Sequence, residues 1–325
     1  MKILCTGAGG ALGGHLVRRL LEDGHQVRAV DIKPKSWWWQ WHPEASNWPG
    51  EDMSLRHACL QAVEEVDQVY DLSANMGGIG WISEHHADAM LSVLISANLL
   101  AASVAEGVQR FWYASSACVY AADKQDSEAR LLVEGDAWPW NPEAGYGEEK
   151  LFSEQLCRYM HQDENLEVRI ARLHNVYGRH STWKDGREKA PAAICRKVAE
   201  AKIQGHDWIE IWGDGTQQRS FLHVDDFVEG AIRIMNSDYA EPVNLGSEEV
   251  VTIDELVTLA EEAAGVKLRR IYDKTAPQGV KGRGSDNRLL KEVTGWEPTT
   301  SLRDGIRDLY GWVEGEVRGL DGLDR

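Results

Sequence analysis

The sequence lacks the features that mark several classes of protein. It has no excess of positive charge, because 35 Lys and Arg stand against 52 Asp and Glu and give a formal net charge of −17. Nucleic acid and anionic membrane surfaces attract basic proteins, so we expect neither of them as a partner. An anionic small molecule is still compatible with this charge, since a local cluster of Arg and Lys can bind one inside an acidic protein.

Cysteine is also scarce and scattered. The five cysteines, an odd number without a Cys-x-x-Cys pair, are Cys5, Cys59, Cys118, Cys157 and Cys195. Such spacing forms neither a disulfide framework nor a redox motif, and it indicates a reducing, cytoplasmic setting. The opening MKILCTGAGG reaches glycine too soon for a secretory signal core or a membrane span, so we expect it to begin with a strand.

Several catalytic motifs are missing as well. His85 and His86 are adjacent, but side chains next to each other diverge, and no His-Glu-x-x-His spacing occurs. Neither a nucleophile elbow nor a phosphate-binding Gly-Lys-Ser loop is present. We therefore expect no metal site.

Short apolar runs alternate with amphipathic helical stretches over the first half of the chain. The expected strands are KILCT, QVRAVD, QVYDLS, RFWYAS and EVRIARL. The expected helices between them cover residues 11–24, 55–63 and 87–107. This alternation predicts an α/β fold with a Rossmann-type doubly wound parallel sheet in residues 1–172. Residues 173–325 would form mainly a smaller, mixed α/β substrate-binding lobe, with some segments returning to the Rossmann domain.

A glycine-rich turn, TGAGGALGG, follows the first strand and opens the first helix. Gly7, Gly10 and Gly13 have the spacing Gly-x-x-Gly-x-x-Gly, which permits a tight turn and close approach of a pyrophosphate to the helix N-terminus. Asp31 ends the second strand, where a carboxylate binds ribose hydroxyls and repels a 2′-phosphate, so NAD is predicted rather than NADP. Asp52 lies where a side chain reaches the adenine in this fold.

A tyrosine and a lysine four residues apart mark the catalytic end. Tyr146 and Lys150 share one face of a predicted helix, and the ammonium is expected to lower the pKa of the phenol, about 10 when free. Ser116, at the end of the fourth strand, is placed to hydrogen-bond the same substrate oxygen. With these motifs, and with LHNVYG at 173–178, the chain resembles the extended short-chain dehydrogenases/reductases that act on nucleotide sugars. The resemblance implies that the tyrosine takes a proton from a sugar hydroxyl while NAD takes the hydride.

Cys118 stands two residues after Ser116, where a related 4-epimerase carries threonine and a 4,6-dehydratase carries an acidic pair just after the serine. A thiol with a free pKa of about 8.5 can exchange protons with carbon, whereas the alternative is a small buried packing residue. The surrounding motifs resemble the GDP-mannose 3,5-epimerase family over nearly the whole chain. They are MGGIGWI (76–82), SSACVY (115–120), DAWP (136–139), TWKDGREKAPAAICRK (182–197), WGDGTQQRSF (212–221) and GVKGRGSDN (279–287).

That resemblance implies an NAD-dependent isomerase and a homodimer. The enzyme would convert GDP-mannose to GDP-L-galactose by inversion at C3 and C5, or to GDP-L-gulose by inversion at C5 alone. Cys118 and Lys189 would be the acid–base pair. We expect the start of the helix after Lys189, with Pro191 in its first turn, to disfavour the charged amine, although a phosphate clamp or a solvated loop charge is the alternative. The implied substrate contacts are Gly77, Ser116, Cys118, Asn175, Glu188, Lys189, Ala190, Lys197, Gln217, Arg219 and Arg283. Arg219 and Arg283 are expected at the diphosphate.

Other interpretations stay open at this point. The chain could invert a single centre or use a different nucleotide, act as a 4,6-dehydratase, or be a non-enzymatic NAD-binding regulator. It departs from the family at Asn75, which replaces an Asp, and at Ala121-Ala122, which replace Pro-Glu. The Trp-rich loop SWWWQWHPEASNW (36–48) is also unfamiliar in that family. It would cover the adenine end of the cofactor, contact a partner chain, or fold onto its own protein.

Overall fold

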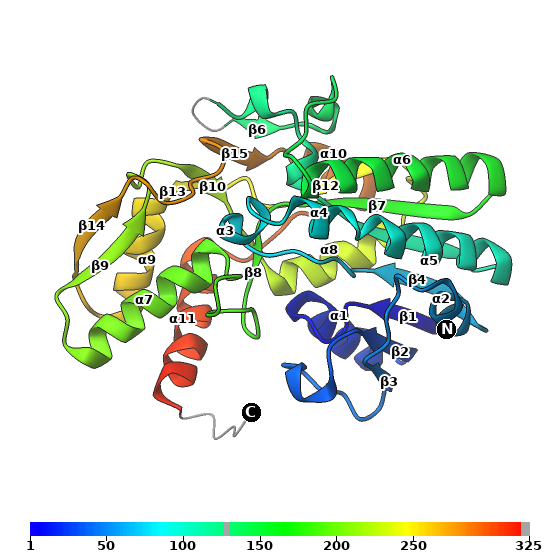
Figure 1. The fold of residues 1–325 in the computed structure, drawn as a ribbon, viewed down its shortest axis with the longest axis horizontal. Coiled ribbons are helices and arrows are strands. Elements are labelled where there is room, and N and C mark those ends of the chain that lie inside the picture. The colour runs from blue at the N-terminus through cyan, green and yellow to red at the C-terminus, as the bar shows by residue number, and fades with distance from the viewer. Residues whose placement is uncertain (127–129, 320–325) are drawn as a thin grey trace.

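A parallel sheet of seven strands forms the centre of the larger lobe, in the order β12-β7-β5-β4-β1-β2-β3 (Figure 1). The computed structural model describes residues 1–126 and 130–319. The strands are β1 (Lys2–Thr6), β2 (Gln26–Asp31), β3 (Ser46–Pro49), β4 (Gln68–Asp71), β5 (Arg110–Ser116), β7 (Glu167–Leu173) and β12 (Pro242–Leu245). All neighbours run parallel, and the order reverses between β1 and β4. This confirms the predicted doubly wound sheet, whose ligand-binding edge is expected at the carboxyl ends of β1 and β4.

Helices cover both faces of this sheet. On one face lie α1 (Ala11–Glu22) and α8 (Val224–Asn236), and on the other lie α2 (Arg56–Val63), α5 (Val93–Glu106) and α6 (Tyr146–Glu164). Leu16 and Phe227 are fully buried on the first side, and Cys59 and Leu99 on the second. Strands covered on both faces are apolar almost throughout, which is why the five strands predicted from apolar runs are found where they were expected.

The apolar stretch His86–Glu106 is long enough, by length and composition alone, to cross a membrane. The sequence predicts one helix over 87–107, but the structure has α4 (His86–Met90) and α5, with Leu91 and Ser92 between them. Helix α5 packs between α2 and α6 against the sheet (Figure 1). Leu99 and Leu100 of α5 are buried in this packing, whereas Leu94 stays exposed.

A smaller lobe surrounds a second apolar core. Its main elements are α7 (Ala190–Gln204), α9 (Ile253–Ala264), α11 (Leu302–Arg318) and the parallel pair β9 (Trp208–Trp212) and β14 (Arg269–Asp273). The three helices pack against one another and bury Ile194, Leu256 and Ile306 between them. In Figure 1 this lobe lies to the left of the large sheet.

Each half of the chain contributes segments to the other lobe. Strand β6 (Leu131–Leu132) joins a mixed sheet with β10 (Gln218–Ser220), β13 (Val250–Thr252) and β15 (Gly282–Ser285). In return, α8 and β12 belong to the larger lobe. The remaining elements are the pair β8 (Val176–Tyr177) and β11 (Leu222–His223), the helices α3 (Ile79–Ile82) and α10 (Arg288–Thr294), and the 3₁₀ turns η1 (Lys35–Trp37), η2 (Ala117–Val119), η3 (Ala122–Lys124) and η4 (Glu134–Ala137).

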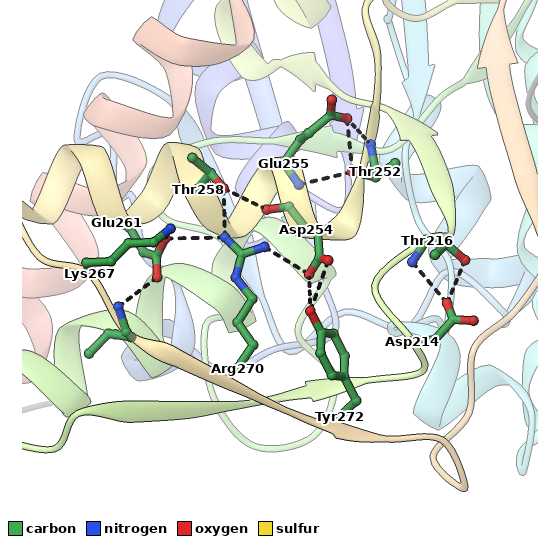
Figure 2. A network of polar contacts seen from close by, with 11 residues as sticks. Asp214, Thr216, Thr252, Asp254, Glu255, Thr258, Glu261, Lys267, Arg270 and Tyr272 are labelled. Atoms are coloured by element: carbon green, nitrogen blue, oxygen red, sulfur yellow. Dashed lines mark hydrogen bonds and ion pairs between the residues drawn. The ribbon is translucent and has the colours of Figure 1, made fainter.

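A polar network fixes the turn that precedes β10 to helix α9 (Figure 2). Arg270 of β14 donates to Glu261 and lies 3.0 Å from an oxygen of Asp254. The Tyr272 hydroxyl donates to the same Asp254 carboxylate at 3.0 Å. The backbone N–H of Asp254 in turn donates to the carbonyl of Gly215 at 3.0 Å. The network thus anchors the segment that leads into β10.

The Trp-rich loop is folded onto its own protein, as one of the three sequence interpretations expects. The Trp38 indole is buried and lies so close to Gly9 that a Cβ added there would sit 2.6 Å from the ring. Trp39 makes an edge-on contact with Trp312 of α11, with ring centroids 5.6 Å apart. Trp37 is the most exposed tryptophan of the loop, at 68%. The loop therefore joins the glycine turn of the larger lobe to the last helix of the smaller one.

Candidate active site

The glycine turn lies at the point where the strand order reverses. Gly7 has φ +67°, and a Cβ added to it would lie 2.8 Å from the carbonyl oxygen of Leu72, which follows β4. A Cβ on Gly13 would lie 2.2 Å from the Gly7 carbonyl oxygen, and Gly10 is the N-cap of α1. Larger residues are excluded at Gly7 and Gly13, and a Cβ on Gly10 would lie 3.2 Å from the Gly7 carbonyl oxygen. A bare backbone at a helix N-terminus suits the pyrophosphate of a dinucleotide, so the residues present fit the predicted cofactor.

The two carboxylates predicted to bind the adenosine part of the cofactor lie near the carboxyl ends of β2 and β3. Asp31 ends β2, is buried, and accepts hydrogen bonds from the N–H groups of Gly9 and Lys33, both at 2.9 Å. Burial raises the pKa of its carboxyl, and the two N–H donors and the Lys33 charge oppose that rise. Asp52 follows β3 and accepts from the Ser54 N–H at 2.9 Å just before α2.

The tyrosine–lysine pair lies at the start of α6. Tyr146 is the first residue of that helix and Lys150 lies one turn later, with its ammonium 5.7 Å from the centroid of the Tyr146 ring. Ser116 ends β5, is buried, and accepts a hydrogen bond from the Cys118 N–H at 3.2 Å. The structure therefore brings together Ser116, Cys118 and Tyr146, as the sequence predicts.

The prediction that Lys150 lowers the pKa of Tyr146 is wrong for this structure. Burial raises the pKa of the phenol, the nearby Cys118 and Glu149 add to that rise, and only a hydrogen bond with Ser116 opposes it. The lysine is engaged elsewhere, because its ammonium donates to the Tyr113 hydroxyl at 3.2 Å and lies 3.6 Å from Glu149. The sequence shows the spacing of the two residues but not how deeply the phenol is buried.

Cys118 is held between charged groups. Nη1 of Arg283 donates to its sulfur at 3.6 Å, and Nη2 of the same guanidinium donates to Glu143 at 3.4 Å. Burial raises the pKa of the Cys118 thiol to about 11, Glu143 acts in the same direction, and Arg283 lowers it. The thiol is therefore neutral near pH 7, a correction to the ease of ionisation expected from the free value.

Lys189 is the N-cap residue of α7, directly before the turn that contains Pro191. Its pKa is lowered, as predicted, but the cause is burial of the ammonium, and the nearby Cys118 opposes it. The loop before Lys189 lies against the glycine segment at 77–78. The N–H of Gly78 donates to the Arg187 carbonyl at 3.0 Å, and a Cβ on Gly77 would lie 2.8 Å from Trp81 and 3.4 Å from Arg187.

Arg219, another predicted substrate contact, also lies near Cys118. Burial and the neighbouring Arg283 lower the pKa of Arg219 to about 10, while Cys118 and Glu143 raise it. Its guanidinium donates to the Gln218 carbonyl at 2.7 Å. The like charges of Arg219 and Arg283 act on each other, and such a pair is compatible with an anionic ligand between or beside them.

The other predicted substrate residues make separate contacts. Gln217 donates to the Gln278 side chain at 2.9 Å, and Asn175, with φ +44°, donates to the Ser220 carbonyl at 3.0 Å. Ala190 opens α7, and Glu188 forms an ion pair with Arg196 at 3.1 Å. The Lys197 ammonium donates to the carbonyl of Glu210 on β9 at 2.9 Å, a contact within the smaller lobe.

Sequence reasoning missed three residues that surround the predicted ones. Glu143 contacts Arg283, Gln125 accepts from Arg283 Nε at 2.6 Å, and Tyr113 holds Lys150. Glu143 lies only three residues before Tyr146, but nothing in that spacing reveals its contact with an arginine 140 residues away. Over residues 1–126 and 130–319, His, Cys, Asp and Glu form no group of three that could hold a metal ion.

The chain is similar to known proteins in both sequence and fold. Residues 3–246 match the model of the NAD dependent epimerase/dehydratase family. The chain is 43% identical over 322 residues to GDP-mannose 3,5-epimerase 1 of Oryza sativa subsp. indica, covering 98% of this chain and 82% of that protein. A UDP-glucose 4-epimerase from Thermotoga maritima has the same fold, with a TM-score of 0.87 at 23% identity over 98% of this chain and 100% of the other. MoeE5, solved with UDP-glucose and NAD, gives a TM-score of 0.79 at 27% identity over 98% and 100% of the two chains.

Proposed function

This chain belongs to the NAD dependent epimerase/dehydratase family, and on that premise we propose that it is a GDP-mannose 3,5-epimerase. The observation that carries the proposal is the meeting of Cys118, Lys189 and Tyr146 in one site. A 4-epimerase inverts C4 by hydride transfer and needs the tyrosine to move the hydroxyl proton. Inversion at C3 and C5 needs further groups that move protons to and from those carbons. The 43% identity to a protein named for that activity supports this choice of substrate.

The cofactor prediction, NAD, is confirmed by the family and by structural neighbours solved with NAD. Gly7, Gly10 and Gly13 would hold its pyrophosphate, and Asp31 would bind the adenosine ribose. When bound, NAD accepts a hydride from C4 of the sugar and later returns it. Every other step falls to the side chains of the protein.

Tyr146 takes the proton from the C4 hydroxyl, and Ser116 hydrogen-bonds the same oxygen. The sugar then carries a ketone at C4, which acidifies the C–H bonds at C3 and C5 because each carbanion is delocalised as an enolate. Tyr146 must be ionised to accept the proton of the C4 hydroxyl, and burial of the phenol opposes that ionisation. A positive charge near the ring favours the ionised form. Lys150 holds its charge beside Tyr113, 5.7 Å from the centroid of the Tyr146 ring.

Cys118 and Lys189 exchange the protons at C3 and C5 from opposite faces of the ring. One group removes a proton from carbon as a base, and the other returns a proton to the opposite face as an acid. Burial favours the neutral thiol of Cys118 and shifts Lys189 towards its neutral amine, which suits the thiol to the role of acid and the amine to the role of base. Return of the hydride to C4 completes the reaction without net oxidation.

Product analysis tests this proposal against its rivals. The protein, loaded with NAD and incubated with GDP-mannose, should yield GDP-L-galactose, with GDP-L-gulose where C5 alone inverts. UDP-glucose serves as the competing nucleotide sugar. Conversion of UDP-glucose with GDP-mannose untouched would contradict the proposal, and so would a 4-keto-6-deoxy product. A protein in which Tyr146→Phe leaves every activity unchanged would be a regulator rather than an enzyme.

We also propose a homodimer. Leu94 on α5 and Phe152 on α6 are large apolar side chains that stay exposed on neighbouring helices, and Phe152 is 53% exposed. A second copy of the chain would cover them. The helix that bears Phe152 also carries Tyr146, so the proposed interface would brace the catalytic helix.

A further inference from the structure

The Arg283 guanidinium joins the Cys118 thiol to a carboxylate that the family resemblance does not single out. It donates from Nη1 to Cys118 Sγ at 3.6 Å, from Nη2 to Glu143 Oε2 at 3.4 Å and from Nε to Gln125 Oε1 at 2.6 Å. All three contacts involve buried or half-buried side chains. A planar guanidinium held at three points has little freedom to turn, so its position against the sulfur is fixed by its other two partners.

Glu143 is itself tied to Cys118 through the backbone. Its N–H donates to the Cys118 carbonyl at 3.0 Å, and its own carbonyl accepts from the Glu148 N–H in the first turn of α6. Gly147 permits this approach, because a Cβ there would lie 2.2 Å from the Cys118 carbonyl oxygen. The carboxylate therefore comes from the segment that places Tyr146, and it meets an arginine from β15.

The charges around the thiol oppose one another. Among the described residues, five groups interact electrostatically with Cys118. They are Arg283 on β15, Arg219 on β10, Lys189 at the start of α7, Tyr146 on α6 and Glu143 before α6. Arg283 favours the thiolate and Glu143 disfavours it. Because Glu143 also pairs with Arg283, it offsets part of the positive charge that the sulfur would otherwise meet.

We propose that Glu143 is a positioning residue that holds Arg283 against the Cys118 sulfur and, by partly neutralising it, keeps the resting thiol protonated. In this arrangement Cys118 is ready to give a proton to the sugar carbanion. When it does so, the S–H bond breaks, a C–H bond forms, and the thiolate left behind is stabilised by the Nη1 donor of Arg283. The role of the thiol as an acid rests on the proposed function, but the link between Glu143, Arg283 and Cys118 does not.

The direct test is a titration of Cys118 without substrate. Thiolate formation is followed by its ultraviolet absorbance in the NAD-loaded protein, as a difference from a Cys118→Ala variant, so the other cysteines cancel. Glu143→Gln removes the negative charge and should shift the Cys118 titration to lower pH, raising the rate of Cys118 alkylation near pH 8, which follows the thiolate fraction, by about three- to tenfold. Arg283→Gln removes the positive charge and should shift it to higher pH. Shifts in the same direction, or no shift in either variant, would overturn the proposal.

Matched controls separate this role from a general loss of structure. Glu143→Asp keeps the charge and should stay within about twofold of the wild type. Glu164→Gln removes one exposed charge at the last residue of α6, the helix that follows Glu143, and should leave the titration unchanged. Peptide-mapped alkylation gives a second readout, since Cys118 is 9% exposed while the other four cysteines are at 0%. Because no sugar is present, a failed product assay with these shifts intact would reject the proposed substrate and leave the positioning role standing.

Discussion

The Lys150 ammonium donates to the hydroxyl of Tyr113 on β5 at 3.2 Å, although the tyrosine that it is expected to assist is Tyr146 on its own helix, α6. Tyr113 in turn donates to Glu149 at 3.3 Å, so the lysine is one member of a buried network behind the catalytic helix. Tyr113 therefore holds the Lys150 ammonium in place. Tyr146 lies one turn before Lys150 on α6.

Replacement of the catalytic phenol is the first prediction. Tyr146→Phe should lower the rate of product formation by about 10²–10⁴-fold, because positioned acid–base catalysis contributes that much. The NAD content of the purified protein should be unchanged, since the hydroxyl is not part of the glycine turn. Tyr113→Phe serves for comparison: it should lower the free energy of unfolding by about 1–3 kcal/mol, because a buried hydrogen-bonding group loses its partner. Equal activity of the Tyr146→Phe variant and the wild type would contradict the assignment.

The buried His174 predicts a pH dependence of stability. It follows β7, hydrogen-bonds Asn244 of β12 at 2.9 Å, and burial lowers its pKa from 6.5 to about 3. Below pH 6.5 the unfolded chain binds a proton that the folded protein does not, so stability falls as the pH drops towards 3, with a slope of at most about 1.4 kcal/mol per pH unit. Chemical unfolding between pH 7 and 5 measures it. His174→Gln cannot titrate and should show a flatter profile; equal slopes would show that another group is responsible.

The contact between Trp39 and Trp312 should stabilise the folded protein by joining the two lobes. Trp39→Ala removes the edge-on contact with α11 and should lower the free energy of unfolding by about 1–3 kcal/mol, because aromatic packing and apolar burial are both lost. Trp37→Ala, in the same loop at 68% exposure, is the matched control and should change it by less than about 0.5 kcal/mol. Thermal unfolding of the two variants decides the matter. A larger loss for Trp37→Ala than for Trp39→Ala would contradict the packing described.

The proposed homodimer is tested at its apolar face. Phe152→Glu places a charge on the exposed surface of α6 and should convert the protein to a monomer, as measured by light scattering after gel filtration. Ile271→Glu on β14, another exposed apolar position, should leave the assembly unchanged. A monomeric wild-type protein would rule out the interface at the outset.

Much of the fold could be predicted because apolar strands buried on two faces are easy to recognise. Strand β12 could not be predicted in the same way, since Pro242–Leu245 is four residues long and includes Asn244, whose side chain is buried by hydrogen bonds to other segments. The stretch 87–107 is predominantly apolar and contains neither proline nor an internal glycine, so its sequence gives no sign of the break at Leu91 and Ser92.

The site could be predicted where chemistry depends on spacing, and not where it depends on burial. Gly7, Gly13 and the tyrosine–lysine pair lie where their motifs place them. The predicted direction of the Tyr146 pKa is wrong, and the rise in the pKa of Cys118 could not be predicted, because both depend on desolvation, which only the fold reveals. Glu143 was missed for a related reason, since its partner Arg283 is distant in the chain.

Deuterium incorporation tests the central claim most directly. GDP-mannose incubated with the NAD-loaded protein in heavy water should acquire deuterium at both C3 and C5, because the two inversions pass through exchange of those protons with Cys118 and Lys189. Cys118→Ala and Lys189→Met should each abolish or sharply reduce this exchange, with NAD content unchanged. Label at one carbon alone would contradict double inversion, and turnover without label at either carbon would contradict proton exchange at carbon altogether.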